Sequence, residues 1–131
     1  MMRAGIDACP HHGPSLAADG NDNLHAVWFV QGPGRAGVFH GRLTGDGVVG
    51  QTRVGSDTAE HADIAASGKK VVIVWKEFDG QASHLRVRVS EDAGTTWREH
   101  GLTRTAGASG QPLLLSRAGR FHVFWNTRRE P

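Results

Sequence analysis

Hydrophobic residues recur along this chain in pairs of short runs, and a polar or glycine-containing turn separates the two runs of each pair. The second runs are the clearest: Leu-His-Ala-Val-Trp-Phe at 24–29, Val-Val-Ile-Val-Trp at 71–75 and Phe-His-Val-Phe-Trp at 121–125. β-Branched and aromatic residues dominate them, a composition that favours short β-strands joined in hairpins. Helical periodicity is not convincing anywhere in the chain. The pattern therefore predicts an all-β protein.

The hairpins form an internal repeat. Trp28, Trp75 and Trp125 end equivalent runs, at intervals of 47 and 50 residues. A second pair of strands is predicted in each of the first two units, at 36–44 and 48–54 and again at 84–90 and 96–105. Four antiparallel strands in about 45–50 residues are typical of one blade of a β-propeller.

We therefore expect a single incomplete domain, residues 9–131, that is a partial β-propeller of about two and a half four-stranded antiparallel blades. The first blade is predicted at 9–56, the second at 57–107 and a half blade at 108–131. Such a set of strands does not close into a ring. Exposed strand edges invite pairing with another chain, so we expect the missing blades or a second copy of the chain as protein partners.

Composition narrows the class of protein. Glycine makes up 18 of the 131 residues, about double its usual share, and its lack of a collagen-like period indicates many turns. The formal net charge of +2 and the lack of a basic run argue against a nucleic-acid partner. No apolar stretch is long enough to cross a membrane, and residues 1–10 do not have the pattern of a signal peptide. Cys9 is the only cysteine, which excludes an internal disulfide.

A motif occupies the turn between the two outer strands of the second unit. Ser90, Asp92, Gly94, Thr96 and Trp97 match every specified position of the pattern Ser-x-Asp-x-Gly-x-Thr-Trp. A short acceptor at Asp92 suits the backbone N–H groups of a turn, and Gly94 can adopt a positive φ without steric cost. Trp97 is expected to pack on the blade. We therefore expect these five residues to be structural rather than catalytic.

This pattern resembles the Asp-box, also called the bacterial neuraminidase (BNR) repeat, of the sialidase-like β-propellers. The resemblance covers the repeat from about residue 9 to residue 125, and a degenerate copy at 44–50 keeps Asp46 in the first unit. It implies a propeller fold, a carbohydrate-related function with a glycan as ligand, and a parent protein that is secreted or periplasmic.

The catalytic residues of sialidases have no counterpart in this chain. Sialidases use a Tyr side chain as the catalytic nucleophile, and this sequence contains no Tyr. Their cluster of three Arg residues, which binds the substrate carboxylate, cannot be assigned to Arg35, Arg86 or Arg88. A six-bladed ring also needs roughly 300 residues. We therefore predict no catalytic residue, and interpret the chain as a non-catalytic fragment of a sialidase-like propeller.

Two other functions stay open at this point. The first is an oligomeric propeller lectin, in which recurring Trp residues of several short chains line sugar sites. Trp28, Trp75 and Trp125 recur in this way, but they end apolar strands and are expected in the core. The second is part of an exo-α-sialidase whose catalytic residues lie outside this chain. None of these functions requires a metal site or a cofactor here, and we predict neither.

Loop positions indicate where a glycan would bind. Turns of antiparallel strands alternate between two ends of a sheet, and the inter-blade connections share one end with the loop at 77–81. Propeller ligands normally bind at that end, over the axis. The polar residues expected there are His11, His12, Arg35, Asp57, Glu60 and His61. The alternative is that they are rim residues without a ligand. His25 and His122, each three residues before a Trp, are expected to pack between blades.

Overall fold

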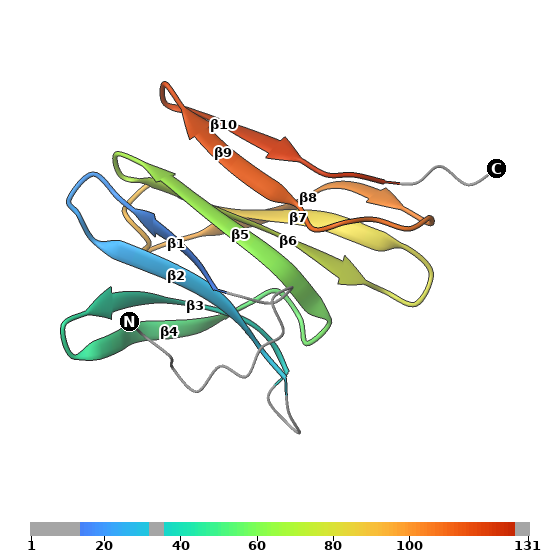
Figure 1. The fold of residues 1–131 in the computed structure, drawn as a ribbon, viewed down its shortest axis with the longest axis horizontal. Helices are drawn as coiled ribbons and strands as arrows, with labels where there is room; N and C mark the ends of the chain where they lie inside the picture. Colours follow the sequence, from blue (N-terminus) through green and yellow to red (C-terminus); the bar gives the residue numbers. More distant parts are fainter. Residues whose placement is uncertain (1–13, 32–35, 128–131) are drawn as a thin grey trace.

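The protein forms ten antiparallel strands and no helix in the part that the structure describes, residues 14–31 and 36–127 of this computed structural model (Figure 1). The strands make two four-stranded sheets and a two-stranded hairpin, and in each of them neighbouring strands follow one another in the sequence. The predicted all-β fold class is thus confirmed. Within these residues there is no helix of the length and apolarity that a membrane crossing needs.

Most strands lie within one or two residues of their predicted positions. The first sheet contains β1 (Ser15–Ala18), β2 (Leu24–Val30), β3 (Gly37–Thr44) and β4 (Gly47–Val54). The second sheet contains β5 (Ala59–Ser67), β6 (Lys70–Phe78), β7 (Ser83–Ser90) and β8 (Arg98–Thr105). The hairpin contains β9 (Leu113–Arg117) and β10 (Arg120–Phe124). β8 begins at Arg98 rather than at the predicted residue 96. The reason is that hydrogen bonds to a side chain occupy the N–H groups of Thr95 and Thr96, which therefore stay in the turn.

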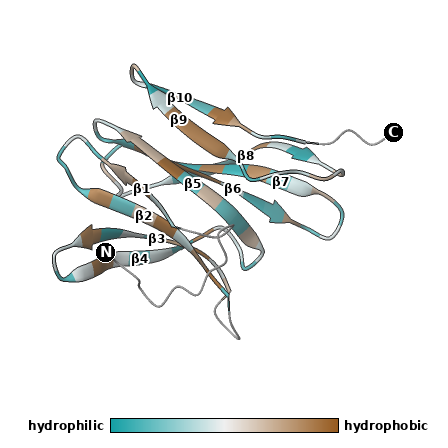
Figure 2. Cartoon of the chain, viewed as in Figure 1, coloured by the Kyte–Doolittle hydropathy of each residue, from teal (hydrophilic) through white to brown (hydrophobic). Residues whose placement is uncertain are grey.

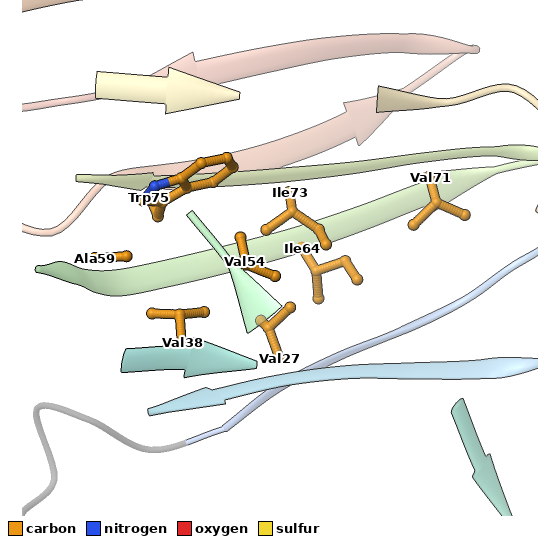
Figure 3. Close-up of a cluster of buried hydrophobic side chains, with 8 residues drawn as sticks. All are labelled: Val27, Val38, Val54, Ala59, Ile64, Val71, Ile73 and Trp75. Carbon is orange, nitrogen blue, oxygen red and sulfur yellow. The ribbon is translucent and has the colours of Figure 1, made fainter. Parts of the chain in front are cut away.

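The two four-stranded sheets pack face to face, with β5 lying against β1, β2 and β3. Their shared core (Figure 3) consists of small and β-branched side chains around one indole, namely Val27, Val38, Val54, Ala59, Ile64, Val71, Ile73 and Trp75. Trp75 is fully buried. This Trp therefore belongs to the core, as predicted, and cannot line a sugar site.

The hairpin adds a third layer, because β9 lies against β5 and β6. The cluster between them contains Val72, Val74 and Val87 of the second sheet together with Leu114, Phe121 and Val123 of the hairpin. Successive side chains of a strand point to opposite faces, so β6 supplies Ile73 to the first core and Val74 to this one. The second sheet thus has packing partners on both of its faces.

The outer strands and the outer face of the hairpin are exposed. β4 and β8 are exposed over nearly their whole length, and each is the last strand of its sheet. Leu113, Leu115 and Phe124 are half or more exposed on the hairpin face turned away from the second sheet, and Figure 2 shows how apolar β9 is. His122 pairs with Leu115 on this exposed face, where no sheet of the described residues covers it, so the prediction that it packs between blades stays a prediction. His25, by contrast, is fully buried.

Candidate functional site

The turns fall at two ends of the stacked sheets. The β1–β2, β5–β6 and β7–β8 turns lie at one end (left in Figure 1), and the β4–β5 and β6–β7 connections lie at the other. At the first end, the N–H of Gly20 donates to the carbonyl oxygen of Gly68 at 2.7 Å, and the N–H of Ala93 donates to that of Lys69 at 2.8 Å. Main-chain hydrogen bonds therefore link these three turns to one another.

Two side chains organise the 90–97 turn between β7 and β8. Ser90 Oγ donates to Asp92 Oδ1 at 2.7 Å and accepts the N–H groups of Asp92 and Gly94. Asp92 Oδ1 accepts the N–H groups of Thr95 and Thr96, and Asp92 Oδ2 accepts the Thr96 hydroxyl at 2.6 Å. These hydrogen bonds, led by the two from Thr96, hold the pKa of Asp92 well below its usual value. Asp92 therefore stays ionised within the turn.

Gly94 and Trp97 join this turn to the first sheet. Gly94 has a φ of 94°, which glycine adopts without steric cost. It also lies against the His25 imidazole, since a Cβ built at Gly94 would lie 3.1 Å from His25 Cε1. The Trp97 ring meets the His40 ring edge-on, with their centroids 5.2 Å apart. The positive φ and the packing of Trp97 are both as the motif predicts.

Beneath the turn lies a buried chain of three polar side chains that no sequence motif predicts. His25 Nε2 is 2.9 Å from Asp19 Oδ2, and His25 Nδ1 is 3.1 Å from His40 Nε2. All three residues are at most 5% exposed. An ionised carboxylate can only accept hydrogen bonds, so His25 Nε2 carries a proton. In the contact between His25 Nδ1 and His40 Nε2, one of the two nitrogens donates a proton and the other accepts it.

Burial and hydrogen bonding together set the protonation of Asp19 and His40. The pKa of His40 is lowered to about 4, chiefly by burial and to a smaller extent by Coulombic interactions with His25, Arg88 and Arg42. Burial alone would raise the pKa of Asp19, but hydrogen bonds from His25 and from two backbone N–H groups of the turn outweigh it and lower the pKa to about 2. Asp19 is therefore ionised and His40 neutral at physiological pH.

A pocket of about 590 Å³ opens at the other end of the sheets. It is lined by Ser56, Thr58, Glu77, Phe78, Asp79, Gly80, His84 and Arg86. Its volume lies within the range of small-molecule sites, roughly 300–1,000 Å³. The loop at 77–81, expected at the ligand end, thus contributes to a pocket there. The sequence prediction places the β4–β5 connection at this end through Asp57 but misses its lining residues Ser56 and Thr58. It also misses the first residues of β7, which the pairing of β6 with β7 brings beside this loop.

Glu77 fixes one wall of the pocket. Its Oε1 accepts the Trp75 Nε1–H at 2.7 Å and the Ser56 N–H at 3.0 Å, and its Oε2 accepts the Ser56 hydroxyl at 3.2 Å. Ser56 Oγ in turn accepts the N–H of Thr58 at 3.2 Å. These hydrogen bonds tie the β4–β5 connection to β6 and hold the wall in one conformation.

Asp79 and His84 form a second fixed pair in the lining. Asp79 Oδ1 accepts the N–H groups of Gln81 at 2.8 Å and Ala82 at 2.9 Å, and Asp79 Oδ2 lies 2.6 Å from His84 Nε2. These hydrogen bonds, led by the one from Ala82, hold the pKa of Asp79 well below its usual value. Because ionised Asp79 only accepts, His84 Nε2 carries the proton of their bond.

Arg86 contributes the guanidinium group of the described lining. Its Nη2 lies 3.7 Å from Glu99 Oε1 on β8, and the other oxygen of Glu99 lies 2.8 Å from Arg88 Nη2. Arg86 is therefore already paired with an acid outside the pocket. The pocket as a whole offers fixed hydrogen-bond donors and acceptors of both charges.

Of the six predicted ligand residues, those that the structure describes do not line this pocket. His11, His12 and Arg35 fall outside the described residues, and the other three are described. Asp57 is exposed between two lining residues, and His61 Nε2 lies 3.6 Å from Glu60 Oε1. The pairing of β5 with β6 is irregular from residue 60 to residue 63, which periodicity along the sequence does not reveal.

Neither a metal centre nor a recurring Trp site is found in the described residues. These contain no group of three or more His, Cys, Asp or Glu side chains placed to hold a metal ion. Trp28 stacks on Phe39, and the Trp125 Nε1–H donates to the carbonyl oxygen of Gly110, so neither lines the pocket. No protein-family model matches this sequence, and a search of curated proteins finds no match either. What the pocket binds therefore has to be inferred from its own residues.

Proposed function

We propose that this chain is part of an Asp-box β-propeller of the sialidase-like kind, that it binds carbohydrate, and that it has no catalytic activity of its own. Two successive four-stranded antiparallel sheets followed by a hairpin support the propeller, in which each sheet would be one blade. The hydrogen bonds that Ser90 and Asp92 accept from turn N–H groups support the Asp-box. Blades from a second copy or another chain would cover the exposed edges.

The observation that carries carbohydrate binding is the polar pocket between the β4–β5 connection and β7. Its acids are held in place before any ligand arrives, Glu77 by Trp75 and Asp79 by Gln81 and Ala82. Fixed groups lose little conformational entropy on binding. Phe78 lines the same pocket and is 54% exposed, so an aromatic ring is available beside the hydrogen-bonding groups. A sugar has the matching surfaces, hydroxyl edges and an apolar ring face.

The same groups argue against glycosidase chemistry. A glycosidase needs a carboxylic acid whose pKa is raised, so that it holds a proton to give to the leaving group. The pKa of Asp79 is shifted in the opposite direction, by the hydrogen bonds that it accepts. The chain also contains no Tyr that could act as a sialidase nucleophile. The pocket thus fits binding without turnover.

A glycan array tests this function. We expect the full chain to bind a defined subset of glycans, and Asp79→Asn to weaken that binding by about tenfold, since hydrogen bonds to charged groups contribute about 1.5–3 kcal/mol. Asn at this position still accepts the N–H groups of the turn, so the loop stays folded. Asp46→Asn, in the β3–β4 turn, makes the same change of charge away from the pocket and should bind like the unaltered chain.

Two results would contradict the proposal. Binding to no glycan by a folded chain would remove the carbohydrate-binding function. Release of the fluorophore from a fluorogenic sialoside or hexoside by the chain alone, lost in Asp79→Asn, would show that the pocket is catalytic after all.

A further inference from the structure

We infer that the pocket lined by Ser56, Glu77, Asp79, His84 and Arg86 takes an uncharged pyranose with adjacent free hydroxyls, and discriminates against sialic acid and other acidic sugars. This inference rests on the carbohydrate-binding function proposed above. It concerns the charge of the sugar, which the resemblance to sialidases would predict to be negative.

The charges of the described lining argue against an anionic ligand. Glu77 and Asp79 are both carboxylates of the pocket wall. The guanidinium of Arg86, which lines the same pocket, lies 3.7 Å from Glu99 and so is partly neutralised from outside the pocket. Recognition of a carboxylate favours a guanidinium free to make two parallel hydrogen bonds. An acidic sugar would have to compete with Glu99 for Arg86 while lying close to two other negative charges.

The hydrogen-bonding groups suit a polyol instead. A hydroxyl both donates and accepts, so two adjacent hydroxyls can donate to a carboxylate and accept from a guanidinium at the same time. Asp79 Oδ2 accepts the His84 Nε2–H and keeps a lone pair, because each carboxylate oxygen has two acceptor sites. Arg86 supplies donors in a fixed fork. A ligand rich in hydroxyls can form hydrogen bonds with all of these groups, and it needs no charge to do so.

The preference for uncharged sugars can be changed without altering the pocket wall, through the pairing of Glu99 with Arg86 and Arg88. Glu99 lies on β8 outside the lining and pairs with both guanidinium groups. Glu99→Gln removes one negative charge and loosens its hold on Arg86, while the amide oxygen can still accept from Arg88. Affinity for an acidic sugar should rise by about threefold, the size expected for one exposed ion pair. Affinity for an uncharged sugar should not change.

The experiment titrates the full chain with five monosaccharide probes and follows the ring protons of His84 by NMR. Methyl α-D-mannoside, methyl β-D-galactoside and N-acetylglucosamine are the uncharged probes, and N-acetylneuraminic acid and glucuronic acid are the acidic ones. We expect at least one uncharged probe to bind more tightly than both acids, and Glu99→Gln to narrow that gap. Thr103→Ser, a conservative change elsewhere on β8, is the matched control and should leave every affinity unchanged.

The outcomes separate the two proposals. If either acid binds most tightly and Asp79→Asn abolishes that binding, the inference about charge is overturned while carbohydrate binding at this pocket stands. If no probe and no arrayed glycan binds the folded chain, both are overturned. If Glu99→Gln does not raise the affinity for either acidic probe, the pairing of Arg86 with Glu99 does not set the preference for uncharged sugars. The inference about charge is then overturned as well.

Discussion

Ser90 and Asp92 serve the same turn from different environments. Ser90 is 0% exposed, whereas Asp92 is exposed. We expect Ser90→Ala to lower the free energy of unfolding by about 1–3 kcal/mol, because the N–H groups of Asp92 and Gly94 lose their acceptor where water cannot replace it. Asp92→Ala should destabilise the chain less, since water can reach its partners. Chemical denaturation measures both losses.

The control for this prediction is Ser67→Ala, which deletes a half-buried hydroxyl at the end of β5, beside the neighbouring β5–β6 turn. It should change the stability by only a few tenths of a kcal/mol, as is usual for surface substitutions. Similar losses in Ser67→Ala and Ser90→Ala would show that the hydrogen bonds of Ser90 have no special weight.

Gly94 combines a backbone requirement with a steric one. Its φ is 94°, and a Cβ would lie 3.1 Å from His25 Cε1. Gly119 in the β9–β10 turn has a φ of 76° and open space around the same position. We therefore expect Gly94→Ala to lower the melting temperature more than Gly119→Ala, because both strain the backbone but only the former presses on a buried ring. Equal shifts would mean that the contact with His25 relaxes freely.

At this scale the sequence motif is a good guide to bonding and a poor one to burial. The spacing of Asp92 and Gly94 predicts an acceptor and a permissive backbone, because both act within the turn itself, whereas Thr96 donates to Asp92 instead of starting β8 as predicted. That Ser90 is sealed from water depends on neighbouring turns, which the motif does not contain.

Among the elements, the contact of β2 with β3 has the clearest pH dependence. The pKa of His40 is lowered to about 4 from the model-peptide value of 6.5, so between these pH values the unfolded chain binds a proton that the folded chain does not. Stability therefore rises with pH in this window. It is fully present above pH 6.5 and falls by about 3 kcal/mol as the pH drops to 4. The lowered pKa of Asp19 adds a loss in the same direction at still lower pH, as its carboxylate becomes protonated on the way down to about 2.

The measurement is the melting temperature from pH 7.5 to 4, for the unaltered chain and for His40→Gln. The variant should be less stable at pH 7.5 but should show a flatter dependence on pH, since the group that titrates has been removed. His84→Gln, which removes a partly exposed imidazole, should keep the original slope. A slope unchanged in His40→Gln would place the titrating group elsewhere. Of the other groups that act on this ring, His25 would then be the next to test, because Arg42 and Arg88 stay protonated throughout this range.

The strands could be predicted from the sequence, but the contacts between them could not. Alternating apolar residues and turn residues fix where β2, β6 and β10 lie, because both act locally. The chain from Asp19 through His25 to His40 depends on the register of β2 with β3 and on the turn that folds back over them. The pocket depends in the same way on the β4–β5 connection reaching Glu77.

For the whole molecule, the exposed apolar face of the hairpin predicts self-association. Leu113, Leu115 and Phe124 lie together on it, half or more exposed, and contiguous exposed apolar residues commonly mark a contact surface. We expect the sedimentation coefficient to increase with protein concentration, and Phe124→Glu to weaken this dependence. Gln81→Glu adds the same charge in the β6–β7 turn and should not. A sharp monomer at every concentration would rule out self-association through this face or through the strand edges.

The three layers differ in how many of their faces pack against another layer, and this difference sets which part of the molecule opens first. The second sheet is covered on both faces, whereas the described contacts of the hairpin are made through one face only. Local opening requires least free energy where the fewest apolar contacts are lost. The amide protons of β9 and β10 should therefore exchange with solvent through detachment of the hairpin alone, on a timescale at which those of β6 stay protected. A hairpin that can detach and return without unfolding the neighbouring sheet is a natural place for exchange with the same hairpin of another copy.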